Sequence, residues 1–95
     1  MKWHKYILFP LLFLFTYKAV ADDLNNGFLK LSENKPEEAI QLWTPLAEAG
    51  DKVAQASLGL LFQTGQGTEV DFIRALELFR ASAKQGYPFA FLSLI

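Results

Sequence analysis

The sequence repeats itself at a spacing of 36 residues, and this spacing constrains the fold more than any other feature. Identical residues recur at this offset in the pairs Ala39/Ala75, Leu42/Leu78, Ala47/Ala83, Gly50/Gly86, Ala54/Ala90 and Leu58/Leu94. Trp43 and Phe79 match in kind at the same offset, as do Ile40 and Leu76. A fixed period of roughly 20–50 residues is the mark of stacked repeats. The sequence therefore predicts a repeat protein whose units pack side by side.

The apolar residues of each repeat recur three and four positions apart, which is typical of amphipathic helices. Five helices are predicted, over residues 22–32, 36–49, 52–64, 72–84 and 88–95. Asp51 and Asp71 stand where helix N-caps are expected. The Gly65-Gln66-Gly67 segment is expected to end a helix, since glycine accepts positive φ. The predicted fold is all-α: an α/α superhelix, built as a right-handed stack of antiparallel helix pairs.

Three residues are unusual for helix interiors. Gly27 and Gly59 each weaken a helix by about 1 kcal/mol relative to alanine, so a close helix–helix approach is expected at both. Pro45 removes a backbone hydrogen bond and is expected to kink its helix. The aromatic residues predicted to lie in the core are Phe28, Trp43, Phe62, Phe72 and Phe79. Phe89 and Phe91 are expected to mark a contact site if they are exposed.

The first 21 residues have the pattern of a secretory signal peptide. Lys2 and Lys5 precede an apolar run over residues 6–16, and Ala19-Val20-Ala21 is a small-x-small ending. Cleavage is predicted between Ala21 and Asp22. A retained membrane anchor is the alternative, but eleven apolar residues fall short of the roughly 20 that cross a bilayer. The expected divisions are therefore a signal peptide over residues 1–21 and a repeat domain over residues 22–95.

Charge and cysteine content limit the classes of partner and the cellular compartment expected for this chain. Residues 22–95 hold six basic and ten acidic residues, a net charge of −4. This balance argues against nucleic acid, which requires a basic surface, and against an anionic membrane surface after cleavage. The chain has no cysteine, so no disulfide supports the domain. The expected location is a bacterial periplasm or the medium.

The chemical inventory after residue 21 contains neither histidine nor cysteine, because the single histidine is His4. The usual zinc sites, a Ser-His-Asp triad and a thiol nucleophile are thereby excluded. The alternative to a non-catalytic chain is a small cell-envelope enzyme that uses Glu69 and Asp71 as paired carboxylates. The simpler interpretation is that Glu69 is a loop charge and Asp71 an N-cap. Ser82 and Lys84 point apart on a helix and are not expected to pair. No catalytic residue, cofactor or metal is predicted.

The residues around the glycine turn resemble the Sel-1-like repeat, a relative of the tetratricopeptide repeat. That pattern reads roughly A-x-x-x-LG-x-x-[YF]-x-x-G-x-G, an acidic residue, then A-x-x-[WL]-[YF]-x-x-[AS]-A-x-x-G. The matching positions are Ala54, Leu58-Gly59, Phe62, Gly65, Gly67, Asp71, Ala75, Leu78-Phe79, Ser82-Ala83 and Gly86. One full repeat is covered over about residues 53–88, with partial repeats on either side. Thr68, Leu78 and Pro45 depart from the pattern.

The resemblance implies a non-catalytic adaptor, because members of this family hold protein partners together and share no catalytic residues. It places the partner on a concave face built by the first helix of each pair. The family's inner-face positions, projected onto this chain, are Val53, Ala56, Leu60, Gln63, Phe89 and Leu92. An apolar lining of this kind suits a helix or an extended peptide. The alternative is that these side chains pack against neighbouring helices.

The very apolar segment after Gly86 leaves three expectations open. In the first, the sequence is a structural fragment of a longer repeat array. In the second, the last helix caps the preceding helix pair, and in the third the last helix completes a homo-oligomer.

Overall fold

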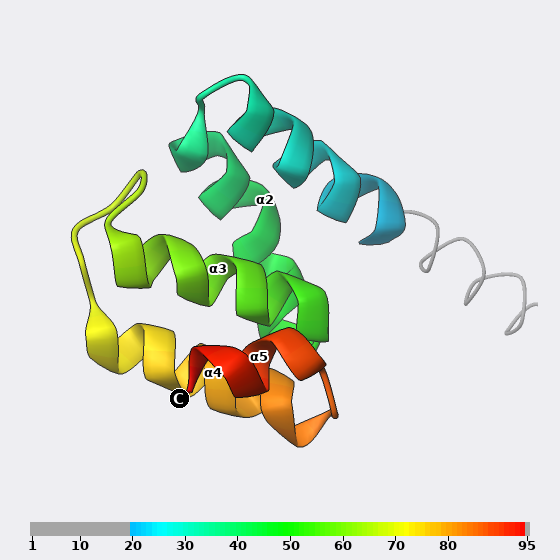
Figure 1. The fold of residues 1–95 in the computed structure, drawn as a ribbon. Helices are drawn as coiled ribbons and strands as arrows, with labels where there is room; N and C mark the ends of the chain where they lie inside the picture. The colour runs from blue at the N-terminus through cyan, green and yellow to red at the C-terminus, as the bar shows by residue number, and fades with distance from the viewer. Residues whose placement is uncertain (1–19, 95) are drawn as a thin grey trace, which may run out of the picture.

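The computed structural model describes residues 20–94, and all the regular structure in that part of the chain is helical (Figure 1). A first helical segment over residues 20–32 is followed by α2 (Pro36–Glu48), α3 (Lys52–Thr64), α4 (Phe72–Lys84) and α5 (Pro88–Ser93). α3 packs against α2 on one side and α4 on the other, and α4 packs against α5. The all-α prediction is therefore confirmed.

The helix bounds follow the predicted ones closely, with differences at both ends of the chain. α3 and α4 have the predicted bounds. The first helical segment already includes Val20 and Ala21, so the predicted cleavage point lies within it, whereas the apolar run over residues 6–16 lies outside the described residues. α5 ends at Ser93 instead of Ile95, which is also outside the described part. α2 continues through Pro45 to Glu48.

Both predicted aspartate caps are present. Asp51 Oδ1 accepts a hydrogen bond from the Ala54 N–H at 2.8 Å, and Asp71 Oδ1 accepts one from the Arg74 N–H at 2.9 Å. Each bond satisfies a backbone donor that the first helical turn leaves unpaired. The caps therefore fix where α3 and α4 begin.

Replacing Asp51 with alanine is expected to lower the free energy of unfolding by about 1 kcal/mol, because the Ala54 N–H loses its acceptor. Urea denaturation followed by far-ultraviolet circular dichroism measures the change. The matched control is Glu69→Ala, which removes an exposed loop carboxylate and should stay within about 0.5 kcal/mol of the unchanged chain. If both variants lost the same unfolding free energy, the Asp51 cap would not stabilise α3 more than an exposed loop carboxylate does.

The main core lies between α2, α3 and α4. Trp43 and Leu58 are fully buried at its centre, together with Leu61. Phe62 is half-buried against this cluster, and Phe79 is buried beside Gly59, as predicted for both aromatics. A second, smaller cluster joins Ala56, Ala83 and Ala90, which brings α5 onto α3 and α4.

Two of the predicted core aromatics are exposed. Phe72 is 69% exposed because it lies in the first turn of α4 and the buried stripe of that helix begins only at Ala75. Phe28 is 42% exposed and covers Trp43 from one side, with the ring centroids 4.9 Å apart in an edge-on arrangement. Leu76, on the same helix as Phe72, is also exposed, whereas Leu78 is buried.

The mid-helix glycines lie where helices approach closely, as predicted. A Cβ on Gly27 would stand 2.7 Å from Trp43 Cδ1, and one on Gly59 would stand 3.0 Å from the Phe79 ring. Real Cβ atoms are not found at the first of these distances, so the first helical segment lies against the Trp43 ring only because residue 27 has no side chain. Gly67, at φ +74°, similarly brings its loop onto the first residues of α2.

Buried polar side chains connect the helices. Gln55 Nε2 donates to the Ala47 carbonyl at 3.1 Å, and Gln85 Nε2 donates to Gln55 Oε1 at 3.0 Å. The Ser82 hydroxyl, fully buried, donates to the Lys52 carbonyl at 2.7 Å. No buried side-chain nitrogen or oxygen of the described residues lacks a hydrogen-bond partner. These bonds fix the position of α4 against α3 and the end of α2, because leaving the buried Gln55 or Ser82 unpaired would carry a desolvation cost.

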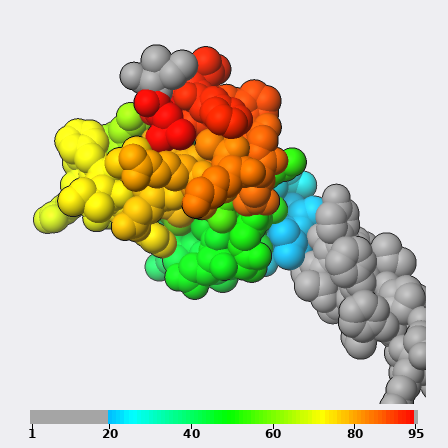
Figure 2. All heavy atoms as spheres, turned by 90° about the horizontal axis from the view of Figure 1, so that it is seen from below, coloured from blue at the N-terminus to red at the C-terminus, as the bar shows by residue number. Residues whose placement is uncertain are grey.

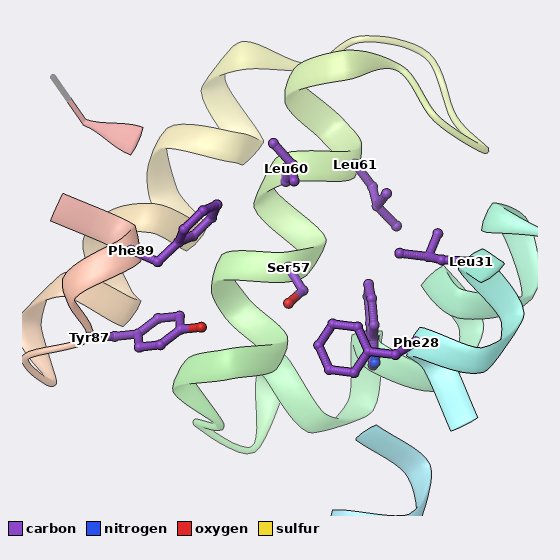
Figure 3. A pocket seen from close by; sticks show the side chains of 8 residues that line it. Phe28, Leu31, Ser57, Leu60, Leu61, Tyr87 and Phe89 are labelled. Atoms are coloured by element: carbon purple, nitrogen blue, oxygen red, sulfur yellow. The ribbon is translucent and has the colours of Figure 1, made fainter. Parts of the chain in front are cut away.

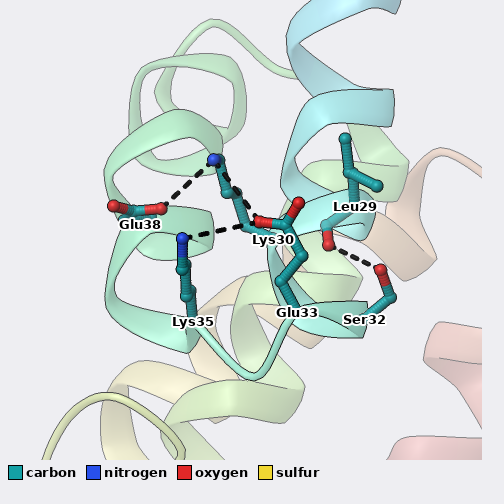
Figure 4. Close-up of polar contacts among 6 residues, drawn as sticks. All are labelled: Leu29, Lys30, Ser32, Glu33, Lys35 and Glu38. Carbon is teal, nitrogen blue, oxygen red and sulfur yellow. Dashed lines mark hydrogen bonds and ion pairs between the residues drawn. The ribbon is translucent and has the colours of Figure 1, made fainter.

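Charged residues join the first helical segment to α2 across the intervening turn (Figure 4). Lys30 Nζ lies 3.5 Å from Glu33 Oε2 and 3.4 Å from Glu38 Oε2, and Lys35 Nζ lies 3.8 Å from the same Glu33 oxygen. The hydrogen bond to Glu38, followed by the charge of Glu33, raises the pKa of Lys30 above its ordinary 10.5. Lys30 therefore keeps its charge throughout the physiological pH range.

Candidate functional site

An open apolar hollow with a volume of about 220 Å³, which we call the groove, lies among the described residues. The lining residues come from several parts of the fold, and they are Phe28, Leu31, Trp43, Ser57, Leu60, Leu61, Tyr87 and Phe89. α3 lies in the middle, with Phe28 and Leu31 on one side and Tyr87 and Phe89 on the other (Figure 3). The groove thus opens between the first helical segment and the start of α5.

The wall formed by Phe28 is held by the packing beneath it. Trp43 is fully buried, and its indole N–H donates to the Leu24 carbonyl at 3.1 Å. This bond fixes the orientation of the indole, and the Phe28 ring contacts that indole edge-on. The groove therefore has a rigid aromatic wall on this side.

The opposite wall is aromatic as well. The Tyr87 and Phe89 rings lie 6.3 Å apart between centroids, and Phe89 is 43% exposed. Pro88 opens α5 between them and sets the direction of the helix, because proline is favoured in a first helical turn. Ser57 on α3 and Tyr87 supply the hydroxyl groups of an otherwise apolar lining, and Figure 3 shows both oxygens facing the hollow. Such a surface can bind apolar side chains and can exchange hydrogen bonds at two points.

The structure brings only part of the predicted partner-binding face to the groove. Leu60 and Phe89 line it, whereas Val53, Gln63 and Leu92 do not. Ala56 is 1% exposed and packs against Ala83 and Ala90, so a partner cannot reach its side chain in this structure. The α3 residues on the groove are Ser57, Leu60 and Leu61, a stripe rotated by one position from the projected one.

Six lining residues were not on the predicted partner-binding face, namely Phe28, Leu31, Trp43, Ser57, Leu61 and Tyr87. Phe28 and Leu31 share one predicted apolar stripe, and this stripe was the available signal for a wall from the first helix. Nothing in the pattern of the sequence distinguishes Ser57 or Tyr87.

Glu69 and Asp71, the carboxylates of the alternative enzyme hypothesis, lie in a loop and at a helix cap. Asp71 caps α4 through its Oδ1, and Glu69 is exposed in the loop before it. Within residues 20–94 there is no group of three histidine, cysteine, aspartate or glutamate residues placed to hold a metal ion. None of the helices in this range has the length and apolarity needed to cross a membrane.

Comparison with known proteins identifies the family. The family model described as the Sel1 repeat matches residues 24–51 and again residues 52–87. The chain belongs to the Sel1 repeat family. Sel1 repeats are generally protein–protein interaction modules with a non-enzymatic repeat fold. The resemblance seen in the sequence is therefore confirmed.

A solved structure supports the Sel1 assignment. The chain superposes on the crystal structure of a Sel1 repeat protein from Oxalobacter formigenes with a TM-score of 0.70 and 29% sequence identity. The match covers 79% of this chain and 32% of the other, so this chain spans about a third of that protein's length. A search among curated proteins finds no match.

Proposed function

We propose that this Sel1 repeat chain is a non-catalytic adaptor that binds a helical or extended segment of a partner protein in the groove. The observation that carries the proposal is the groove itself, an apolar hollow with aromatic walls on both sides of α3. Family membership supports it, because Sel1 repeats are interaction modules.

The size of the groove favours a peptide side chain over a small-molecule cofactor. Its volume of about 220 Å³ lies below the roughly 300–1,000 Å³ of small-molecule sites. One or two bulky apolar side chains, presented by a helix at positions such as i and i+4, would contact Phe28, Leu60 and Phe89 together. The Ser57 and Tyr87 hydroxyls would bond to the polar groups of that segment.

Selection from a displayed library of random peptides tests this function and does not require an identified partner. The selected peptides are expected to share bulky apolar residues at helical or alternating spacing and to shift the NMR signals of Leu60 and Phe89. Selection of peptides without apolar anchors, or shifts confined to the outer side of α4, would refute the proposed site.

We further propose that the adaptor acts after export, in a bacterial periplasm or beyond. The lysines, apolar run and small-x-small ending of residues 1–21 support this location. N-terminal sequencing of the chain recovered from the periplasm or medium should give Asp22 as the first residue. Recovery of the chain only from the cytoplasm, with Met1 intact, would exclude export.

A further inference from the structure

Two hydroxyl groups in the groove have no hydrogen-bond partner among residues 20–94. Elsewhere in the helices of this range, serine and threonine hydroxyls donate to a backbone carbonyl at 2.6–3.1 Å, and these residues are Ser32, Thr44, Thr64, Ser82 and Ser93. Ser57 is the exception among the helical hydroxyls of the described residues. Its Oγ faces the hollow instead, as does the Tyr87 hydroxyl (Figure 3). The groove therefore offers two unpaired hydrogen-bonding groups.

These two hydroxyls place a condition on whatever fills the groove. Ser57 and Tyr87 are both partly exposed, so each hydroxyl can bond to water in the free chain. A segment that covers them displaces this water, and covering a hydroxyl without replacing its hydrogen bond is costly. The occupant must therefore bring a polar group into a hollow whose lining is otherwise apolar.

The walls around the two hydroxyls favour an aromatic occupant. Phe28 covers Trp43 on one side, and Phe89 lies on the other, 43% exposed on α5, which lies at the surface beside α4 (Figure 2). Aromatic rings gain more from edge-on contact with other rings than the apolar area they bury would give. Phe28 and Trp43 already make such a contact, with 4.9 Å between their centroids. A ring entering the hollow can do the same.

A helical partner segment has to supply the polar group from a side chain. The backbone N–H and C=O groups along the middle of a helix are bonded to each other, so none is left for Ser57 or Tyr87. Trp43 shows how this chain itself accommodates a ring with a polar edge. Its body is fully buried, and its indole N–H donates to the Leu24 carbonyl at 3.1 Å. Tyrosine and tryptophan are the side chains that join an apolar ring to such a group.

We infer that the partner segment anchors in the groove through a tyrosine or a tryptophan, whose polar group bonds to the hydroxyls of Ser57 and Tyr87. This inference rests on the proposed function and specifies the side chain through which the partner binds. Ser57 and Tyr87 determine specificity, because a phenylalanine or leucine anchor would leave their hydroxyls covered and unpaired.

Binding of peptides selected on the unchanged chain tests the inference. The anchor of a peptide is the residue whose replacement by alanine weakens binding most, and it is varied among tyrosine, tryptophan, phenylalanine and leucine. Fluorescence anisotropy should show that tyrosine or tryptophan binds at least about tenfold more tightly than phenylalanine or leucine. In the double variant Ser57→Ala, Tyr87→Phe, this preference should fall to about twofold or less. Each substitution removes an oxygen without a partner in the described chain, so the fold should be retained.

The matched control is Thr64→Ala, which removes a hydroxyl from the same helix at a position outside the groove. It should leave the tenfold preference unchanged. Peptides that shift the NMR signals of Leu60 and Phe89 but bind equally well with phenylalanine or leucine at the anchor would overturn the inference and leave the proposed function intact. A double variant that weakens the tyrosine and phenylalanine peptides equally would also overturn it, because the peptide backbone would then be the partner of the hydroxyls. Peptides that bind only outside the groove would refute both.

Discussion

Replacing Trp43 with alanine is expected to lower the free energy of unfolding by about 3–5 kcal/mol. Trp43 is fully buried between the first helical segment and α3, so the truncation leaves a cavity. The Leu24 carbonyl loses the indole N–H that it accepts, and Phe28 loses its packing partner. A folded chain of this size is stabilised by only about 5–10 kcal/mol, so the substitution should remove about a third or more of that stability.

Urea denaturation followed by far-ultraviolet circular dichroism measures this loss. Leu29→Ala is the matched control, because it truncates a 52% exposed leucine on the helical segment that covers Trp43. Its effect should stay within about 0.5 kcal/mol. If Trp43→Ala were as mild as Leu29→Ala, Trp43 would not be the centre of the core.

The second large effect is expected in binding. Leu60→Glu should weaken a peptide selected on the unchanged chain by at least about 30-fold, which corresponds to a contact worth roughly 2 kcal/mol. Leu60 lines the floor of the groove, and a carboxylate there would lose water when the peptide binds. Fluorescence anisotropy of the labelled peptide gives the two dissociation constants.

Gln63→Glu supplies a matched control on the same helix. Gln63 is exposed and does not line the groove, although the sequence placed it on the partner-binding face. The same negative charge at this position should change the affinity by less than about threefold. Equal losses in Leu60→Glu and Gln63→Glu would favour the face projected from the sequence over the groove.

The sequence predicts the helices well because their ends carry local chemical signals. Asp51 and Asp71 place the starts of α3 and α4, and Gly65 ends α3 in a left-handed conformation at φ 71°. The 36-residue repeat then predicts how one pair of helices follows another. The cap and glycine signals act over a few residues, so they do not depend on how the helices cross.

The site is harder to predict because it depends on helix crossing. An apolar stripe on a helix does not show how far along the helix its neighbour extends. α3 covers α4 from Ala75 onward, which leaves Phe72 exposed although it continues the same stripe. The groove likewise contains side chains from the first helical segment, α2, α3 and α5. The way these helices cross determines which face of α3 lines the groove.

The proposed function depends on one claim, that a partner protein binds between the walls formed by Phe28 and Phe89. Photo-crosslinking in living cells tests it most directly, with a photoreactive phenylalanine analogue placed at position 60, 89 or 41. Gln41 is exposed on α2 and does not line the groove. The account predicts that positions 60 and 89 capture the same protein and that position 41 does not. Capture at position 41, with nothing captured from position 60 or 89, would contradict it.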